Sequence, residues 1–250
     1  MRYELMFADQ IRQAIKENWP VILPVGVLEY HSEHCVVGVD TLLIVRAVEL
    51  LEKEMNLVQL PAFYYGAASY VVEPPAGNGS VHVDSQVIHP FARELFKSLL
   101  AIGFRNIHLF VHHQSENFAA GMPTDLAFRF AARQIIFEYL DKEKGAGWWG
   151  DNSMKDYYSQ HEAGTDPFSW IQVHPFMDAE TQKKYPIDHA NLQETSLMMA
   201  FCPEGVDMKK LSQKKWYCQQ AHQANLEYGN AAKEMILASM RKRLKLEVKS

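Results

Sequence analysis

Apolar residues occur along this chain in two patterns: short continuous runs, and longer segments with apolar positions three and four residues apart. Short runs that contain β-branched or aromatic residues predict buried strands. They lie at residues 21–27, 56–66 and 106–113. Spacing by three and four predicts helices with one buried face. Such segments lie at residues 8–18, 41–55, 89–103 and 123–134.

The remaining segments are less regular. Residues 134–140 form another apolar run, which fits either a continuation of the preceding helix or a further strand. Residues 141–188 are rich in Gly, Trp, Asp and Tyr, and this composition predicts an irregular region. We expect a helix over residues 189–206, followed by a tail over 208–247 that is mostly helical.

Strands and helices therefore alternate along the chain. This order predicts an α/β fold of three layers, α/β/α, in which helices cover both faces of a mostly parallel central sheet. No internal repeat or linker divides the sequence, so we expect one domain over residues 1–250. In open sheets of this kind, ligands bind beyond the carboxyl ends of the strands. The polar segments that follow the runs 21–27 and 106–113 are thus the first places to look for a site.

Composition narrows the class of protein. The chain has 250 residues and a net charge of -5, which gives no electrostatic attraction to nucleic acid or anionic membranes. No apolar run reaches the roughly 18 residues of a membrane span. The three cysteines form no CxxC pair, and the first residues lack the basic-then-apolar pattern of a signal peptide. We therefore expect a cytoplasmic protein with a small-molecule substrate.

The first polar segment contains Glu29 and His31, and Asp40 follows at the start of a predicted helix. Residues two apart in an extended segment point to the same side, so Glu29 and His31 can share a site. Two carboxylates with one imidazole suit Zn²⁺, Mn²⁺ or Fe²⁺ better than Ca²⁺ or Mg²⁺. Asp40 also fits a second interpretation, because Asp is a preferred residue at the N-cap of a helix.

Two further segments carry histidine beside carboxylate. His112 and His113 end the third predicted strand, and Glu116 follows three residues later. Adjacent side chains on a strand point in opposite directions, so we expect only one of these histidines, His113, to face a site. His189 and Glu194 lie at the start of the helix predicted from residue 189. Each segment alone is also compatible with a solvated turn or helix start.

Together the three segments resemble the creatininase (creatinine amidohydrolase) family. LPVGVLEYHSEHCVVGVDT at 23–41 resembles that family's PVG-x-x-E-Q-H-G-P-H-(x)-LG-x-D-T signature, and HANLQETS at 189–196 its HAG-x-x-ETS segment. GFRNIHLFVHH at 103–113 is similar to a family strand that ends in NGH. Weaker similarities to family segments lie at Pro61, at Tyr65-Gly66 and in GNGSVHV at 77–83.

The resemblance implies a hydrolase with two divalent metal ions, Zn²⁺ or else Mn²⁺ or Fe²⁺. It implies that Asp40 bridges the ions, that Glu29 and His113 bind one of them, and that His31 binds the other. The remaining carboxylate is either Glu116 or Glu194, since the branches of the family differ on this point. The resemblance also implies a homo-oligomer, often a hexamer.

The chain departs from the family pattern in several positions. Val111 and His112 stand where the family has Asn-Gly, and Asn191 stands where it has Gly. A residue is inserted between His113 and Asn117; a register without this insertion would place Gln114 in the ligand position. Gln114 is a poor metal ligand, which favours His113.

A metal-activated water that attacks a carbonyl carbon is the chemistry that this site implies. In that reaction Glu116 would accept the proton of the water and His189 would protonate the leaving group. Trp148, Trp149 and Trp170 are candidates to line the substrate pocket. The departures leave the substrate open between a small, cyclic amide and an inositol-derived cyclic diketone cleaved at a C–C bond. A protein that binds metal or ligand without catalysis is the alternative of a different class.

Overall fold

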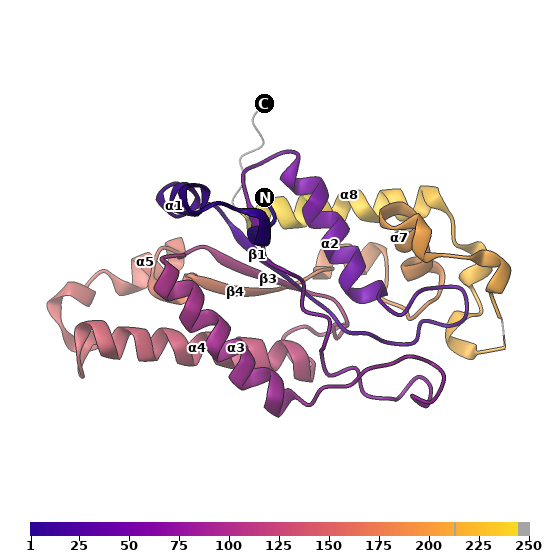
Figure 1. Cartoon of the computed structure of the whole chain (residues 1–250), viewed down its shortest axis with the longest axis horizontal. Coiled ribbons are helices and arrows are strands. Elements are labelled where there is room, and N and C mark those ends of the chain that lie inside the picture. Colours follow the sequence, from indigo (N-terminus) through magenta and orange to yellow (C-terminus); the bar gives the residue numbers. More distant parts are fainter. Residues whose placement is uncertain (213, 245–250) are drawn as a thin grey trace.

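The fold is described from a computed structural model of residues 1–212 and 214–244. A four-stranded sheet lies at its centre. Neighbouring strands are parallel and their order is β2-β1-β3-β4. Figure 1 labels β1, β3 and β4. The strands are β1 (Val21–Val25), β2 (Val58–Gln59), β3 (Ile107–Val111) and β4 (Ile171–Pro175). The register pairs Val25 with Val111, so β1 and β3 end side by side.

Helices cover both faces of this sheet (Figure 1). One face packs against α3 (Ser85–Ile102) and α4 (Pro123–Lys144), and the other against α2 (Val39–Glu52), α7 (Leu192–Phe201) and α8 (Leu226–Arg243). The shorter helices are α1 (Ala8–Lys16), α5 (Tyr157–Ala163) and α6 (Ala179–Lys184). The predicted three-layer α/β/α fold with a parallel sheet is thus confirmed.

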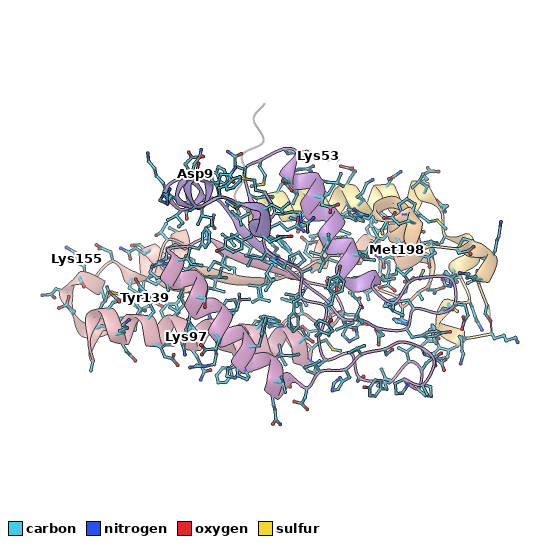
Figure 2. All side chains as sticks on the ribbon, viewed as in Figure 1. Asp9, Lys53, Lys97, Tyr139, Lys155 and Met198 are labelled. Carbon is cyan, nitrogen blue, oxygen red and sulfur yellow. The ribbon has the colours of Figure 1, made fainter. Side chains whose placement is uncertain are left out.

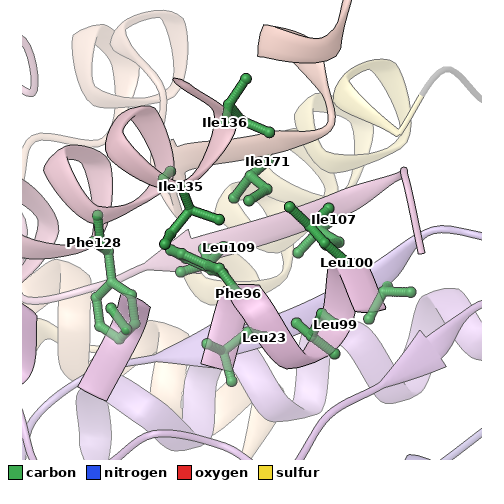
Figure 3. Packing of buried hydrophobic residues seen from close by; sticks show 14 of the residues in the cluster. Leu23, Phe96, Leu99, Leu100, Ile107, Leu109, Phe128, Ile135, Ile136 and Ile171 are labelled. Carbon is green, nitrogen blue, oxygen red and sulfur yellow. The ribbon is translucent and has the colours of Figure 1, made fainter. Parts of the chain in front are cut away.

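Successive residues of β1 and β3 contribute alternately to two separate hydrophobic cores. Leu23 and Leu109 point to the face of α3 and α4, whereas Ile22 and Phe110 point to the face of α2, α7 and α8. Figure 3 shows the first of these cores, in which Phe96 lies among strand and helix side chains. Full burial of a side chain of this size stabilises the fold by about 1.5–3 kcal/mol. Because both faces of the sheet are buried, side chains on both sides of each strand are mostly apolar. Each strand therefore appears in the sequence as a nearly continuous apolar run.

Lysine side chains lie on the outer surface of the molecule, as two examples show. Lys97 and Lys155 project from the surface, while Met198 of α7 is buried (Figure 2). Among the helices of residues 1–212 and 214–244, none has both the length and the apolar character that crossing a membrane requires.

Several elements differ from the sequence-based expectations. Residues 134–140 continue α4, and the irregular region 141–188 hides a strand, β4, which is short and mixes polar with apolar residues. β2 has only two residues of the run 56–66. The helix expected over 189–206 is shorter, at Leu192–Phe201.

The tail also differs from the expectation of a mostly helical segment. Short 3₁₀ turns occupy much of the stretch before Asn225, and α8 begins only at Leu226. Residues 245–247 of the predicted helical tail lie outside the described residues.

Candidate metal centre

Six polar side chains, five of them buried and one, His113, partly buried, converge beyond the carboxyl ends of β1 and β3. Each comes from a loop that follows one of these strands or from the first turn of α2 or α7. They are Glu29, His31, Asp40, His112, His113 and Glu194. Gly26 permits this packing, since a Cβ there would lie 2.4 Å from Thr41 Oγ1 at the start of α2.

The first group consists of Glu29, Asp40 and His113, whose ligand atoms lie within 4.8 Å of one another. His113 Nδ1 is 3.1 Å from Glu29 Oε2 and 4.0 Å from Asp40 Oδ2. His189 borders this group, with Nδ1 3.8 Å from Glu29 Oε2. Two carboxylates and one or two imidazoles thus face a common point.

The second group consists of His31, Asp40 and Glu194, again within 4.8 Å. His31 Nε2 is 3.4 Å from Glu194 Oε2 and 3.8 Å from Asp40 Oδ2. Asp40 belongs to both groups, which is the arrangement expected of a bridging carboxylate. A third set within the same distance, Glu29, His31 and His189, overlaps each of these groups. Gly38 is the N-cap residue of α2, so the predicted capping role of Asp40 is wrong; its carboxylate points into the site instead.

Both adjacent histidines face the site, against the expectation that only His113 would. β3 ends at Val111, and His113 adopts a left-handed conformation with φ of 62°, so the alternation of a strand no longer holds there. His112 Nε2 lies 3.4 Å from Glu194 Oε1 and 4.0 Å from Asp40 Oδ1. Gln114 points elsewhere, because its amide exchanges two hydrogen bonds with the backbone of Met177.

The two candidate carboxylates occupy different positions. Glu194 is buried among His31, His112 and Asp40. Glu116 is exposed at the rim of the cavity, outside both groups of converging side chains. Sequence alone left the choice open because branches of the resembled family take this carboxylate from different segments, and the chain has a candidate in each.

The charges of the site are strongly coupled. Burial disfavours the cationic form of His31, but the negative charges of Glu194 and Asp40 outweigh this and raise its pKa to about 10. Burial likewise disfavours the carboxylate of Glu194, yet the charge of His31 and the contact with His112 hold its pKa well below the usual range. The carboxylates therefore demand a positive charge between them, which either protonated imidazoles or a metal cation supplies.

Unsatisfied polar atoms test whether a metal fits. Among the described residues, His31 Nε2, Asp40 Oδ2 and both ring nitrogens of His112 are buried without a hydrogen-bond partner. Such atoms are costly to bury unless something pairs with them. Their mixture of imidazole nitrogen and carboxylate oxygen matches the ligands of Zn²⁺, Mn²⁺ and Fe²⁺. The residues present fit a divalent metal centre.

Neighbouring groups hold these side chains in place. The Nδ1 of His31 lies 2.9 Å from the carbonyl oxygen of Glu29, and the Nε2 of His189 lies 2.8 Å from that of Tyr30. Each contact leaves the other ring nitrogen directed toward the carboxylates. The backbone N–H of Ala190 donates to Glu194 Oε2 at 2.7 Å. Contacts of this kind set the orientation of metal-binding side chains.

A cavity of about 450 Å³ opens above the two groups. Asp40, His112 and His113 lie among its lining residues, and Val71 and Trp216 also border it. The Trp216 side chain is 82% exposed, and its neighbour Lys215 forms an ion pair with Glu73, which ties two loops together beside the cavity. Trp216 and Tyr217 were missed because they lie in a segment expected to be a helical tail; the adjacent aromatic pair was the available signal.

The three tryptophans predicted to contact substrate lie elsewhere. Trp148 is buried in the core, where its Nε1 donates to Asp141 Oδ1 at 2.8 Å. Trp149 packs against Tyr157 and Tyr158, and Trp170 packs against Arg105 just before β4, at the amino ends of the strands. None of the three lines the cavity above the metal groups, within the described part of the chain. Aromatic residues of an irregular region serve packing here.

Known proteins share both the sequence pattern and the fold. A curated relative, creatinine amidohydrolase from Pseudomonas putida, is 25% identical over 218 residues, which cover 83% of this chain and 74% of the relative. A solved structure of creatininase with Mn superposes with a TM-score of 0.72 at 17% identity, covering 100% of this chain and 99% of that one. A mutant creatininase of the Zn-Zn type gives 0.71 at 16% identity, covering 100% and 98%.

The two solved structures establish a common fold. The family profile described as creatinine amidohydrolase matches residues 4–239, which include every residue of the site. The chain belongs to the creatininase family.

Proposed function

We propose that this chain is a divalent-metal-dependent hydrolase that cleaves a small, amide-type substrate. The observation that carries the proposal is the convergence of Glu29, His31, Asp40, His113 and Glu194 beside a cavity open to solvent. When bound, divalent ions at such a site lower the pKa of a coordinated water toward neutrality and polarise a carbonyl oxygen. The relative from Pseudomonas putida, a creatinine amidohydrolase, supports amide cleavage.

The residues divide between two ions in this proposal. Glu29, Asp40 and His113 would hold one, while His31, Asp40 and Glu194 would hold the other. Related creatininase structures are described with Mn and as the Zn-Zn type, which supports either of these metals. The same donors also accept Fe²⁺.

His189 is our candidate for moving a proton. Its ring is held through Nε2 by the carbonyl oxygen of Tyr30, which leaves Nδ1 facing the site near Glu29. His189 borders the cavity, so a substrate bound there would meet this ring. We assign it the protonation of the leaving group. Glu116, at the exposed rim, remains the candidate that accepts the proton of the attacking water.

The cavity suits a small substrate. Its volume of about 450 Å³ lies within the roughly 300–1,000 Å³ of small-molecule sites. Asp188, Asn191 and Glu116 add polar groups to the lining. These groups would also suit the hydroxyls of a polyol ring, so cleavage of a C–C bond in a cyclic inositol-derived diketone is the second candidate. The replacement of the family's glycine by Asn191 is the departure that keeps this candidate beside a cyclic amide.

A substrate screen tests the proposal. The protein is loaded with Zn²⁺ or Mn²⁺, its metal content is measured, and turnover of cyclic ureides, formamides and cyclic polyol ketones is followed. We expect turnover in one of these classes, lost in Asp40→Asn. Metal binding without turnover of any class would favour a non-catalytic binding protein instead.

A further inference from the structure

His112 takes no part in the ligand scheme given above, yet it is among the most buried polar residues of the chain. Its exposed fraction is 3%. The ring packs against Phe176, with the ring centroids 5.3 Å apart. Both ring nitrogens lack a hydrogen-bond partner among the described residues. Burying an imidazole in this way costs free energy unless a further group pairs with it.

The position of Nε2 indicates what that group is. It lies 3.4 Å from Glu194 Oε1 and 4.0 Å from Asp40 Oδ1, and both carboxylates belong to the group that includes His31. Ligands about 2.05 Å from a tetrahedral zinc ion are about 3.3 Å apart. The contact between His31 and Glu194 is also 3.4 Å. His112 Nε2 thus lies near ligand spacing from one oxygen of each carboxylate, while His31 Nε2 faces the other oxygen of each.

We propose that His112 is a fourth protein ligand at the subsite of His31, Asp40 and Glu194. Four protein ligands close a tetrahedral site, whereas catalytic zinc sites retain an open position for water. The subsite of Glu29, Asp40 and His113 would then be the one that keeps a water. This inference rests on the metal-binding part of the proposed function and not on hydrolysis. Because the chain carries His112 where the family pattern has glycine, the closed subsite would be a feature of this chain.

X-ray absorption at the zinc edge provides the test. The full-length protein is loaded with one equivalent of Zn²⁺, and the number of imidazoles per zinc is measured in the wild type, His112→Phe and His112→Gln. Phe keeps the ring volume against Phe176 but removes both nitrogens. We expect two imidazoles in the wild type and one in each variant. Competition with a chromophoric chelator should show the affinity for this ion falling by at least about 100-fold, since loss of even an indirect contact costs about 10–100-fold.

Controls separate the possible failures. His89→Phe changes a histidine that stacks on Phe130, away from the cavity, and should leave zinc affinity and imidazole count unchanged. Thermal unfolding checks that each variant folds. An imidazole count that stays the same in both His112 variants overturns the ligand assignment, even if affinity falls, because His112 would then act on Glu194 alone. A wild type that binds no zinc overturns both proposals, whereas zinc binding without turnover removes only the hydrolase.

Discussion

Two histidines of the same strand region meet opposite surroundings. His108 lies near the amino end of β3, and His112 lies just past its carboxyl end. The ring of His108 has a partner on each side: Nδ1 is 2.9 Å from His174 Nε2, and Nε2 is 2.8 Å from Asn106 Oδ1. Neither nitrogen of His112 has a hydrogen-bond partner among the described residues, and two carboxylates lie within 4.0 Å.

The contrast shows when a buried imidazole acts as a structural group and when as a ligand. Burial, and then the neighbouring His108, lower the pKa of His174 to about 2, so His174 is neutral. At the other end of the sheet, carboxylates raise the pKa of His31 to about 10. Helix starts and the loops after β1 and β3 bring Glu29, Asp40 and Glu194 together at the carboxyl end. Where these carboxylates converge, a cation is needed; His108 and His174 instead contact one another.

Removal of Asp40, the carboxylate shared by both groups, should have the largest effect on the carboxyl end of the sheet. Asp40→Ala should reduce the metal content from about two ions per chain to one or fewer, because Asp40 belongs to both groups. Hydrolysis should fall by at least about 10³-fold. Elemental analysis and the activity assay measure these effects. Asp166→Ala is the control, since Asp166 is equally buried but caps a turn before β4. Full metal content in Asp40→Ala would contradict a bridging role.

The next largest effects should distinguish the two candidate carboxylates, Glu194 and Glu116. Glu194→Gln should lose about one ion, because Glu194 contacts both His31 and His112 inside the site. Glu116→Gln should keep both ions and, if this residue accepts the proton, lower kcat by about 10²–10⁴-fold. Metal analysis and steady-state kinetics on both variants decide the matter. Unchanged kcat in Glu116→Gln would remove its proposed role and leave the proton to another group.

At the amino end of the sheet, the loss of stability in acid tests whether His174 is held neutral. The folded pKa of His174 lies near 2, below about 6.5 in the unfolded chain, so the unfolded state binds more protons as pH falls. Stability from this residue is present above about pH 6.5 and is lost below it, by about 2 kcal/mol at pH 5. Urea unfolding at pH 7 and 5 should show this loss reduced in His174→Gln. An equal loss in wild type and variant would mean that His174 is not held neutral.

The smallest expected effect concerns the aromatic residues, which also differ between the two ends. Trp216 borders the cavity, whereas Trp170 lies at the amino ends of the strands. Trp216→Ala should raise KM by about 3- to 10-fold, as expected for an aromatic contact of about 1 kcal/mol. The value of kcat should stay within about twofold. Trp149→Ala, at a half-exposed tryptophan away from the cavity, should leave KM unchanged.

Sequence by itself determined the architecture and the chemistry of the site. Alternating strands and helices follow from local hydrophobic spacing, which is why β1, β3 and the three-layer order were predictable. The mixture of carboxylate and imidazole at Glu29, His31 and Asp40 follows from residue identity alone. So does the location of these residues after a buried strand, where parallel sheets bind ligands.

Tertiary structure decided which of the remaining candidates meet. The left-handed conformation of His113 lets both adjacent histidines face the site, and no local sequence pattern predicts that conformation. Glu194 lies inside because the first turn of α7 meets the loops after β1 and β3 at His31 and His112, whereas Glu116 lies in an exposed part of the segment after β3. For the same reason Trp148, Trp149 and Trp170 lie away from the cavity, whereas Trp216 borders it. Contacts between segments far apart in the chain depend on packing, which spacing along the sequence does not encode.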